Sequence, residues 1–180
     1  MDTQGILLVS YGSFEIDYLA RIASSVKSEF QLPVNFTEKF IDLSVFYDPT
    51  RRQYDGNKLL KQIDNEYGSS KDKTIGLFHV DLFIPILTFI FGQAILQGKA
   101  GIVSSYRLKN ELYGMPRNED LLFNRFLKII IHELGHAFGL IHCHIPTCVM
   151  RPGTYVEDID QKKHTLCPKC RGILKIVVTR

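Results

Sequence analysis

Residues 132–142 read H-E-L-G-H-A-F-G-L-I-H, a set of side chains whose spacing suits a metal-dependent hydrolase. On a helix, His132 and His136 would lie one turn apart on the same face, so both imidazoles could bind one metal ion. Glu133 is rotated by about 100° from His132, which places its carboxylate beside the metal, near a bound water. Gly139 can adopt a positive φ and turn the chain, so that His142 returns as a third ligand. Three histidines leave one coordination position open, which is typical of catalytic zinc.

Chance explains this string poorly. A chain of this composition would contain H-E-x-x-H about 0.01 times, and the longer string with Gly139 and His142 roughly 2 times in 100,000. A single histidine on a helix is most often a hydrogen-bonded structural residue. The complete set predicts instead that zinc lowers the pKa of a water molecule and that Glu133 takes its proton as general base.

All four cysteines follow this string as two close pairs, Cys143 with Cys148 and Cys167 with Cys170. Short pairs separated by a longer spacer match a structural zinc site with four thiolate ligands. Two disulfides or free thiols are the alternatives, and a reducing compartment disfavours the disulfides. We therefore expect two Zn²⁺ per chain, with the second tying the segment after His142 to the C-terminal segment.

The histidine string resembles that of the metzincin zinc peptidases. Met150, eight residues after His142, matches the methionine that these enzymes carry in a turn beneath the metal. The order of the cysteines around Met150 resembles the archaemetzincin family more specifically, as do residues 91–94 (FGQA) and 103–108 (VSSYRL). The resemblance implies a compact metzincin-type domain with one catalytic and one structural zinc.

The surrounding sequence predicts the elements that position these residues. We expect strands at 5–12, 33–42, 74–80, 87–91 and 100–105, and helices at 15–30 and 57–67. A longer helix should begin after Asn118 as N-cap, continue to about Phe138 and end at Gly139. The fold class is therefore α+β with α/β character: a mixed twisted sheet with helices, followed by an irregular, zinc-stapled C-terminal segment. We expect a single catalytic domain over 1–180, divided into subdomains 1–139 and 140–180.

Composition sets the broader limits. The chain has 180 residues, of which 45% are hydrophobic and 23% charged, and its net charge is +3. These values exclude a disordered chain. The most apolar stretch, residues 82–96, is too short for a membrane helix, and no basic residue precedes the first apolar run as in a signal peptide. We expect a cytoplasmic monomer that binds neither membrane nor nucleic acid.

Several further residues receive weaker assignments. His79 and Asp81 are expected to be structural or at the surface, and His144 to lie outside the zinc sites. Tyr155 is a weak candidate for stabilising the tetrahedral intermediate, by resemblance to some metzincins. Residues 87–91 are expected to form the sheet edge where an extended peptide adds as a strand, again by resemblance. The basic tail, with Lys162, Lys163, Lys169, Arg171 and Lys175, is interpreted as a solvated face that compensates the thiolates.

Three functions are compatible with these patterns. The first is a zinc-dependent metallopeptidase acting on a peptide or protein substrate. The second is a catalytically quiet zinc-binding interaction module of the same fold, against which Glu133 argues because a binder has no need of it. The third is a nucleic-acid-binding zinc module, which would bind with a steep salt dependence.

Overall fold

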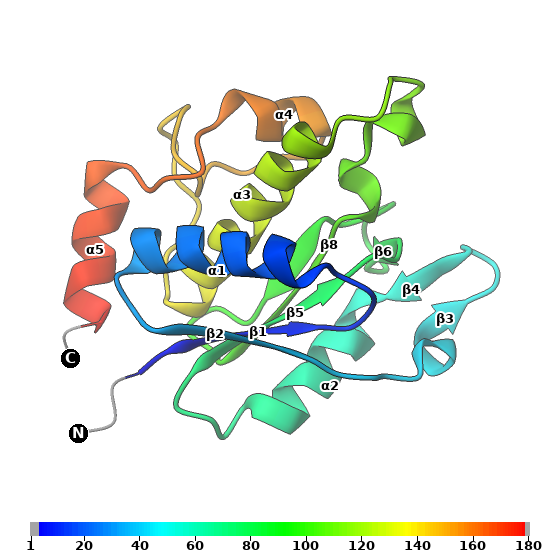
Figure 1. Cartoon of the computed structure of the whole chain (residues 1–180), viewed down its shortest axis with the longest axis horizontal. Helices are drawn as coiled ribbons and strands as arrows, with labels where there is room; N and C mark the ends of the chain where they lie inside the picture. The colour runs from blue at the N-terminus through cyan, green and yellow to red at the C-terminus, as the bar shows by residue number, and fades with distance from the viewer. Residues whose placement is uncertain (1–3, 179–180) are drawn as a thin grey trace.

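A five-stranded sheet lies at the centre of the computed structural model, which describes residues 4–178 (Figure 1). The spatial order is β2-β1-β5-β8-β7, and all neighbours are parallel except β7, which runs antiparallel to β8. The strands are β1 (Ile6–Ser10), β2 (Val34–Glu38), β5 (Lys73–Phe78), β7 (Gly92–Ala94) and β8 (Ala100–Ser104). The central strands β5 and β8 are buried along their full length, as expected for parallel strands covered on both faces.

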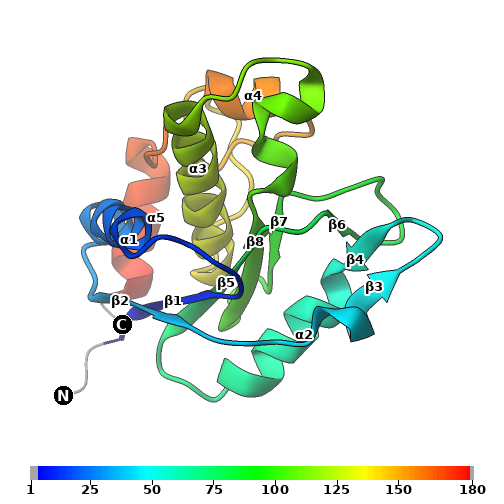
Figure 2. The same cartoon turned by 45° about the vertical axis from the view of Figure 1, so that its right-hand side comes forward.

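Helices cover both faces of this sheet. On one side lie α1 (Ile16–Phe30), α3 (Glu119–Ala137) and α5 (Pro168–Val178), and on the other lies α2 (Gly56–Tyr67) (Figure 2). Each side has its own apolar cluster, the larger one formed with α1 and α3 and the smaller one with α2. This arrangement of a mixed sheet and helices confirms the expected α+β fold class.

Shorter elements complete the fold. A second sheet with the order β3-β4-β6 is formed by β3 (Tyr47–Asp48), β4 (Gln53–Asp55) and β6 (Leu82–Phe83). Single 3₁₀ turns occur at η1 (Leu43–Phe46), η2 (Tyr106–Leu108) and η3 (Asn110–Tyr113), and α4 (Val156–Gln161) is a short helix near the start of α3. No helix within residues 4–178 has the length and apolar character needed to cross a membrane.

The long helix α3 begins and ends as its sequence predicts. The Asn118 side chain accepts a hydrogen bond from the Leu121 amide at 2.9 Å, which caps the first turn. At the other end Gly139 has φ +93°, a left-handed conformation that favours glycine, and its amide donates to the His136 carbonyl at 2.8 Å. The chain therefore reverses directly after the second histidine.

Two expectations about elements are wrong in detail. Residues 87–91 do not form a strand: Ile90 makes one isolated bridge to Leu82, and the edge strand β7 begins only at Gly92. The C-terminal segment is not irregular throughout, because it contains α4 and α5. Short apolar runs do not determine which residues pair, because pairing depends on partners distant in sequence.

Candidate active site

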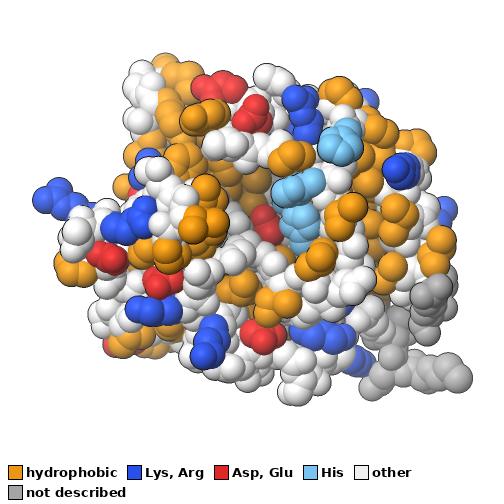
Figure 3. All heavy atoms as spheres, turned by 180° about the vertical axis from the view of Figure 1, so that it is seen from behind, with side chains coloured by type: hydrophobic (Ala, Val, Ile, Leu, Met, Phe, Trp, Pro, Cys, Tyr) orange, Lys and Arg blue, Asp and Glu red, His pale blue; other side chains and the backbone are white. Residues whose placement is uncertain are grey.

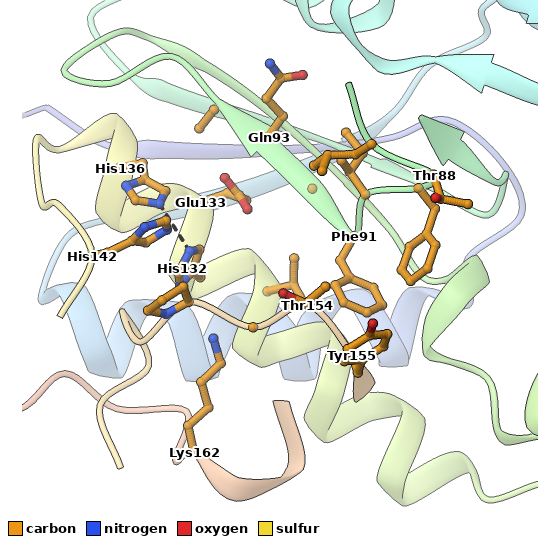
Figure 4. A pocket seen from close by; sticks show the side chains of 18 residues that line it. Thr88, Phe91, Gln93, His132, Glu133, His136, His142, Thr154, Tyr155 and Lys162 are labelled. Carbon is orange, nitrogen blue, oxygen red and sulfur yellow. Dashed lines mark hydrogen bonds between the residues drawn. The ribbon is translucent and has the colours of Figure 1, made fainter. Parts of the chain in front are cut away.

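The three predicted histidines converge at the C-terminal end of α3. His132 and His136 come from successive turns of the helix, and their Nε2 atoms lie 3.1 Å apart. The turn at Gly139 brings His142 back, so that one ring nitrogen from each histidine lies within 4.8 Å of the others. Figure 4 shows the three imidazoles facing one another at one end of a cleft.

Hydrogen bonds at the far side of two rings orient their nitrogens. Nδ1 of His132 lies 2.8 Å from the Val149 carbonyl, and Nδ1 of His136 lies 2.8 Å from the Leu140 carbonyl. A carbonyl only accepts, so each Nδ1 must carry the proton and each Nε2 must present a lone pair. Two lone pairs 3.1 Å apart repel unless a cation lies between them, and this separation is close to the ~3.3 Å edge of a zinc–nitrogen tetrahedron. The histidines therefore fit a metal ion.

Loss of hydration favours the neutral form of these histidines, although His142 is the most exposed of the three. Desolvation lowers the pKa of His132 well below its usual value, and it also lowers the pKa of His136 and of His142. Neutral imidazole is the form that binds a metal.

Met150 lies directly beneath this part of the helix, as the resemblance implies. It is completely buried, and a Cβ atom at Gly135 would overlap its sulfur. Only glycine therefore lets Met150 pack against α3 between the two metal-facing histidines.

Glu133 faces the other wall of the cleft. Its carboxylate lies against the backbone of β7, since a Cβ at Gly92 would be 2.9 Å from Glu133 Cγ and 3.1 Å from Oε1. Burial raises the pKa of Glu133 to about 8, although the positive charge of Lys162 opposes the rise. The carboxyl group therefore lies beside the histidine cluster, as its place in the sequence predicts, and holds its proton readily near neutral pH.

The cleft itself has a volume of about 500 Å³ and runs between β7 and the segment after Met150. Figure 3 shows it as a hollow bordered by histidine side chains, with an acidic side chain at its floor and hydrophobic side chains on both sides. One wall is formed by residues 87–94 and the other by residues 152–155, with Ile129 of α3 between them. Within the described residues β7 pairs only with β8, so its outer edge is free to hydrogen-bond an extended peptide.

Lys162 is a site residue, contrary to the expectation from the sequence. It was expected on a solvated face, but it is 3% exposed and lines the cleft, extending toward His132 in Figure 4. Its ammonium group donates to the Arg151 carbonyl at 2.7 Å, and burial lowers its pKa to about 8. One signal could have found it: Val156, Ile159 and Lys162 recur at a spacing of three, which continues the buried face of α4.

The four cysteines form a second cluster. All four are buried, and one sulfur from each lies within 4.8 Å of the others. The Sγ–Sγ distances are 3.8 Å both for Cys143 and Cys167 and for Cys148 and Cys170, which is far too long for a disulfide. The same distance, ~3.8 Å, is the edge of a tetrahedron with zinc–sulfur bonds of about 2.3 Å. The thiols therefore fit a zinc ion.

A network of side chains positions the wall formed by residues 87–89. Asp81 accepts two hydrogen bonds from Arg107, at 2.8 and 2.5 Å, and one from Gln53 at 3.2 Å. Gln53 also donates to the Thr88 carbonyl at 2.9 Å, and the Arg107 guanidinium lies 4.8 Å from the ring centre of Phe89. Asp81 is thus structural, as expected, and it helps to hold the rim of the cleft.

The remaining histidines and Tyr155 belong to neither of the two clusters. His79 is bonded to Ser105 at 2.7 Å in a different part of the fold, and His144 and His164 are exposed. Tyr155 is exposed at the mouth of the cleft.

Comparison with known proteins gives a consistent result. Residues 11–176 match the model of peptidase family M54. An archaemetzincin from Methanocaldococcus jannaschii is 39% identical over 131 residues, covering 72% of this chain and 71% of the relative. An archaemetzincin from Thermococcus kodakarensis is 37% identical over 166 residues, covering 91% of this chain and 86% of the relative.

Solved structures agree in fold. The crystal structure of archaemetzincin from Methanopyrus kandleri superposes with a TM-score of 0.85 at 28% identity, covering 99% of this chain and 97% of that one. A zinc-dependent peptidase from Methanocorpusculum labreanum superposes with a TM-score of 0.84 at 28% identity, covering 94% of this chain and 100% of that one.

Proposed function

The chain belongs to peptidase family M54 and is a zinc metallopeptidase, and from this premise we propose that Glu133 acts as its general base beside a three-histidine zinc. The resemblance to archaemetzincins is thereby confirmed. The observation that carries the proposal is the convergence of three neutral histidines next to a buried carboxylate in an open cleft.

We propose that His132, His136 and His142 hold the catalytic metal through Nε2 of the first two and a ring nitrogen of the third. When bound, zinc supplies a Lewis acid that lowers the pKa of water and polarises a peptide carbonyl. The carbonyls of Val149 and Leu140 keep the first two rings in the required tautomer and orientation.

The proton transfers are assigned to Glu133. One carboxylate oxygen accepts a proton from the water that attacks the peptide carbonyl, and the same carboxyl group then delivers a proton to the leaving amine nitrogen. A buried carboxyl group beside the histidines suits this double role, because it can accept a proton and deliver it within the cleft. The free edge of β7 lies alongside, where it can align an extended substrate.

We further propose that the four cysteines hold a structural zinc, which gives two zinc ions per chain. The cluster joins Cys143, next to the third histidine, to Cys167 and Cys170 at the start of α5. It is therefore placed to hold subdomain 140–180 against the end of α3.

The test compares wild type with Glu133→Ala. The variant should retain the same zinc content, measured by elemental analysis, and should lose cleavage of any internally quenched peptide that the wild type cleaves. Undiminished cleavage by Glu133→Ala would exclude the general-base role. Intact zinc with no cleavage by wild type in a broad peptide library would favour the alternative of a zinc-binding interaction module.

A further inference from the structure

Lys162 brings a positive charge into the cleft that no acidic side chain neutralises by direct contact. It is 3% exposed, and among the described residues its ammonium group makes one hydrogen bond, to the Arg151 carbonyl, and no ion pair. We propose that Lys162 binds a carboxylate on the substrate residue next to the cleaved bond, so that the enzyme selects acidic peptides. This inference rests on the proposed function of the cleft.

The first support is the charge distribution of the cleft. Apart from the three histidines, Glu133 and Lys162 are the only acidic or basic side chains among the described residues that line it. A divalent cation at the histidines would leave the cleft floor with a net positive charge, which Glu133 only partly offsets. The apolar walls reduce the screening of that charge by water, so an acidic substrate group is favoured there.

The second support is that Lys162 is held rigidly. It directly follows α4, and Asp160 of α4 accepts two hydrogen bonds from Arg125 of α3, at 2.8 and 2.6 Å. Lys128 of α3 donates to the Ile159 carbonyl at 2.9 Å. These contacts fix the position of Lys162, and they engage the Asp160 carboxylate with Arg125. A preorganised donor loses little entropy when it binds its ligand.

The third support is direction. Figure 4 shows the Lys162 side chain extending toward His132 on the side of the cleft where Thr154 lies, while Gln93 of β7 points the other way. A substrate side chain entering between His132 and the wall at residues 152–155 would therefore approach the ammonium group.

A purely structural role makes a different prediction. Lys162 also lies near the four-cysteine cluster, since Cys148 is among the groups that act on its charge. If compensation of thiolates were its only role, removing the charge would weaken zinc retention at the cysteines and leave ligand selectivity unchanged.

The test measures binding, and so does not depend on turnover. Two short peptide hydroxamates, identical except for an Asp or an Asn side chain next to the zinc-binding group, are titrated into zinc-loaded protein by calorimetry. We expect the Asp compound to bind about 10- to 100-fold more tightly to wild type. Lys162→Met should reduce this ratio to about 2-fold or less, whereas Lys162→Arg should preserve most of it.

Lys73→Met is the matched control, because Lys73 is also a buried lysine whose ammonium group donates to a backbone carbonyl, that of Gly98 at 2.7 Å, but it does not line the cleft. It should leave the ratio unchanged. Equal affinities of wild type for the two compounds, no binding of either, or a preference that survives in Lys162→Met would each overturn the proposal.

If Lys162→Met does not retain zinc, Lys162→Gln replaces it, because its uncharged amide can still donate to the Arg151 carbonyl. Loss of the preference for the Asp compound in Lys162→Gln supports the proposal, and an undiminished preference contradicts it. Failure of the Glu133→Ala test would remove the general-base mechanism without altering these affinities, so the two proposals fail separately.

Discussion

Replacing Gly135 with alanine should destabilise the protein, although alanine is the better helix former. An added Cβ would overlap Met150 Sδ and lie 2.9 Å from its Cε. Met150 is 0% exposed, so any movement of its side chain must be taken up by the residues packed around it. Overpacking of this kind costs about 1–3 kcal/mol, against a gain of about 1 kcal/mol in helix propensity. We expect a net loss of up to about 2 kcal/mol in the free energy of unfolding.

Gly172→Ala is the matched control. Gly172 lies within α5, and an added Cβ there would have no heavy atom within 4 Å. The substitution should therefore stabilise the protein by about 0.5–1 kcal/mol through helix propensity alone. Urea denaturation of the zinc-loaded proteins, with matched m values, should separate the two variants by about 0.5–3 kcal/mol.

The reasoning is refuted if Gly135→Ala gains as much stability as Gly172→Ala. A double variant gives a second check on the cause. Met150→Ala alone should cost about 2–5 kcal/mol, because it empties a fully buried site. On that background Gly135→Ala should cost nothing further, since the sulfur that it would overlap is gone.

Three other predictions concern different parts of the fold. In metal-free protein, burial raises the pKa of Glu133 from 4.5 to about 8, so the folded state keeps a proton that the unfolded chain releases. The contribution of this group to the free energy of unfolding therefore falls as the pH rises from 4.5 to about 8. Over the same pH range Glu133→Gln should become progressively more stable than wild type, as measured by urea denaturation. Arg125→Ala should cost about 2–5 kcal/mol, because it empties a buried site and removes the donor to the Leu108 carbonyl. A loss below about 1 kcal/mol would show that these contacts are not needed. Asp81→Ala should increase hydrogen exchange in residues 84–91 while zinc content stays constant, and unchanged exchange there would show that the rim is held by other contacts.

Local signals predicted the helix that carries the histidines. Its start depends on Asn118 and its end on Gly139, two residues whose effect is confined to neighbouring backbone. The 3.6-residue repeat then places His132 and His136 on one face without help from the rest of the chain. For this reason the three-histidine cluster was predictable to the residue, and so was the four-cysteine cluster, whose ligands come in close pairs.

Features that depend on distant partners were not predictable in the same way. The edge strand begins at Gly92 instead of residue 87 because its partner is Val103 of β8, and the sequence of the edge does not specify that register. The sequence predicts an exposed Lys162 because most lysine side chains in proteins are exposed. Its burial depends instead on contacts between α4 and α3, which the local sequence does not specify. The Asp81 network joins residues more than 25 positions apart.

The two clusters share one stretch of backbone, so their formation cannot be independent. Val149 receives the hydrogen bond from His132, and its own amide donates to Thr165, two residues before Cys167. The Cys143 amide, next to His142, donates to the Met150 carbonyl at 3.0 Å. The segment that joins the cysteines therefore also supplies the acceptor that fixes the tautomer of His132 and the residue that packs beneath Gly135. Folding of the cysteine segment thus contributes to the order of the three histidines.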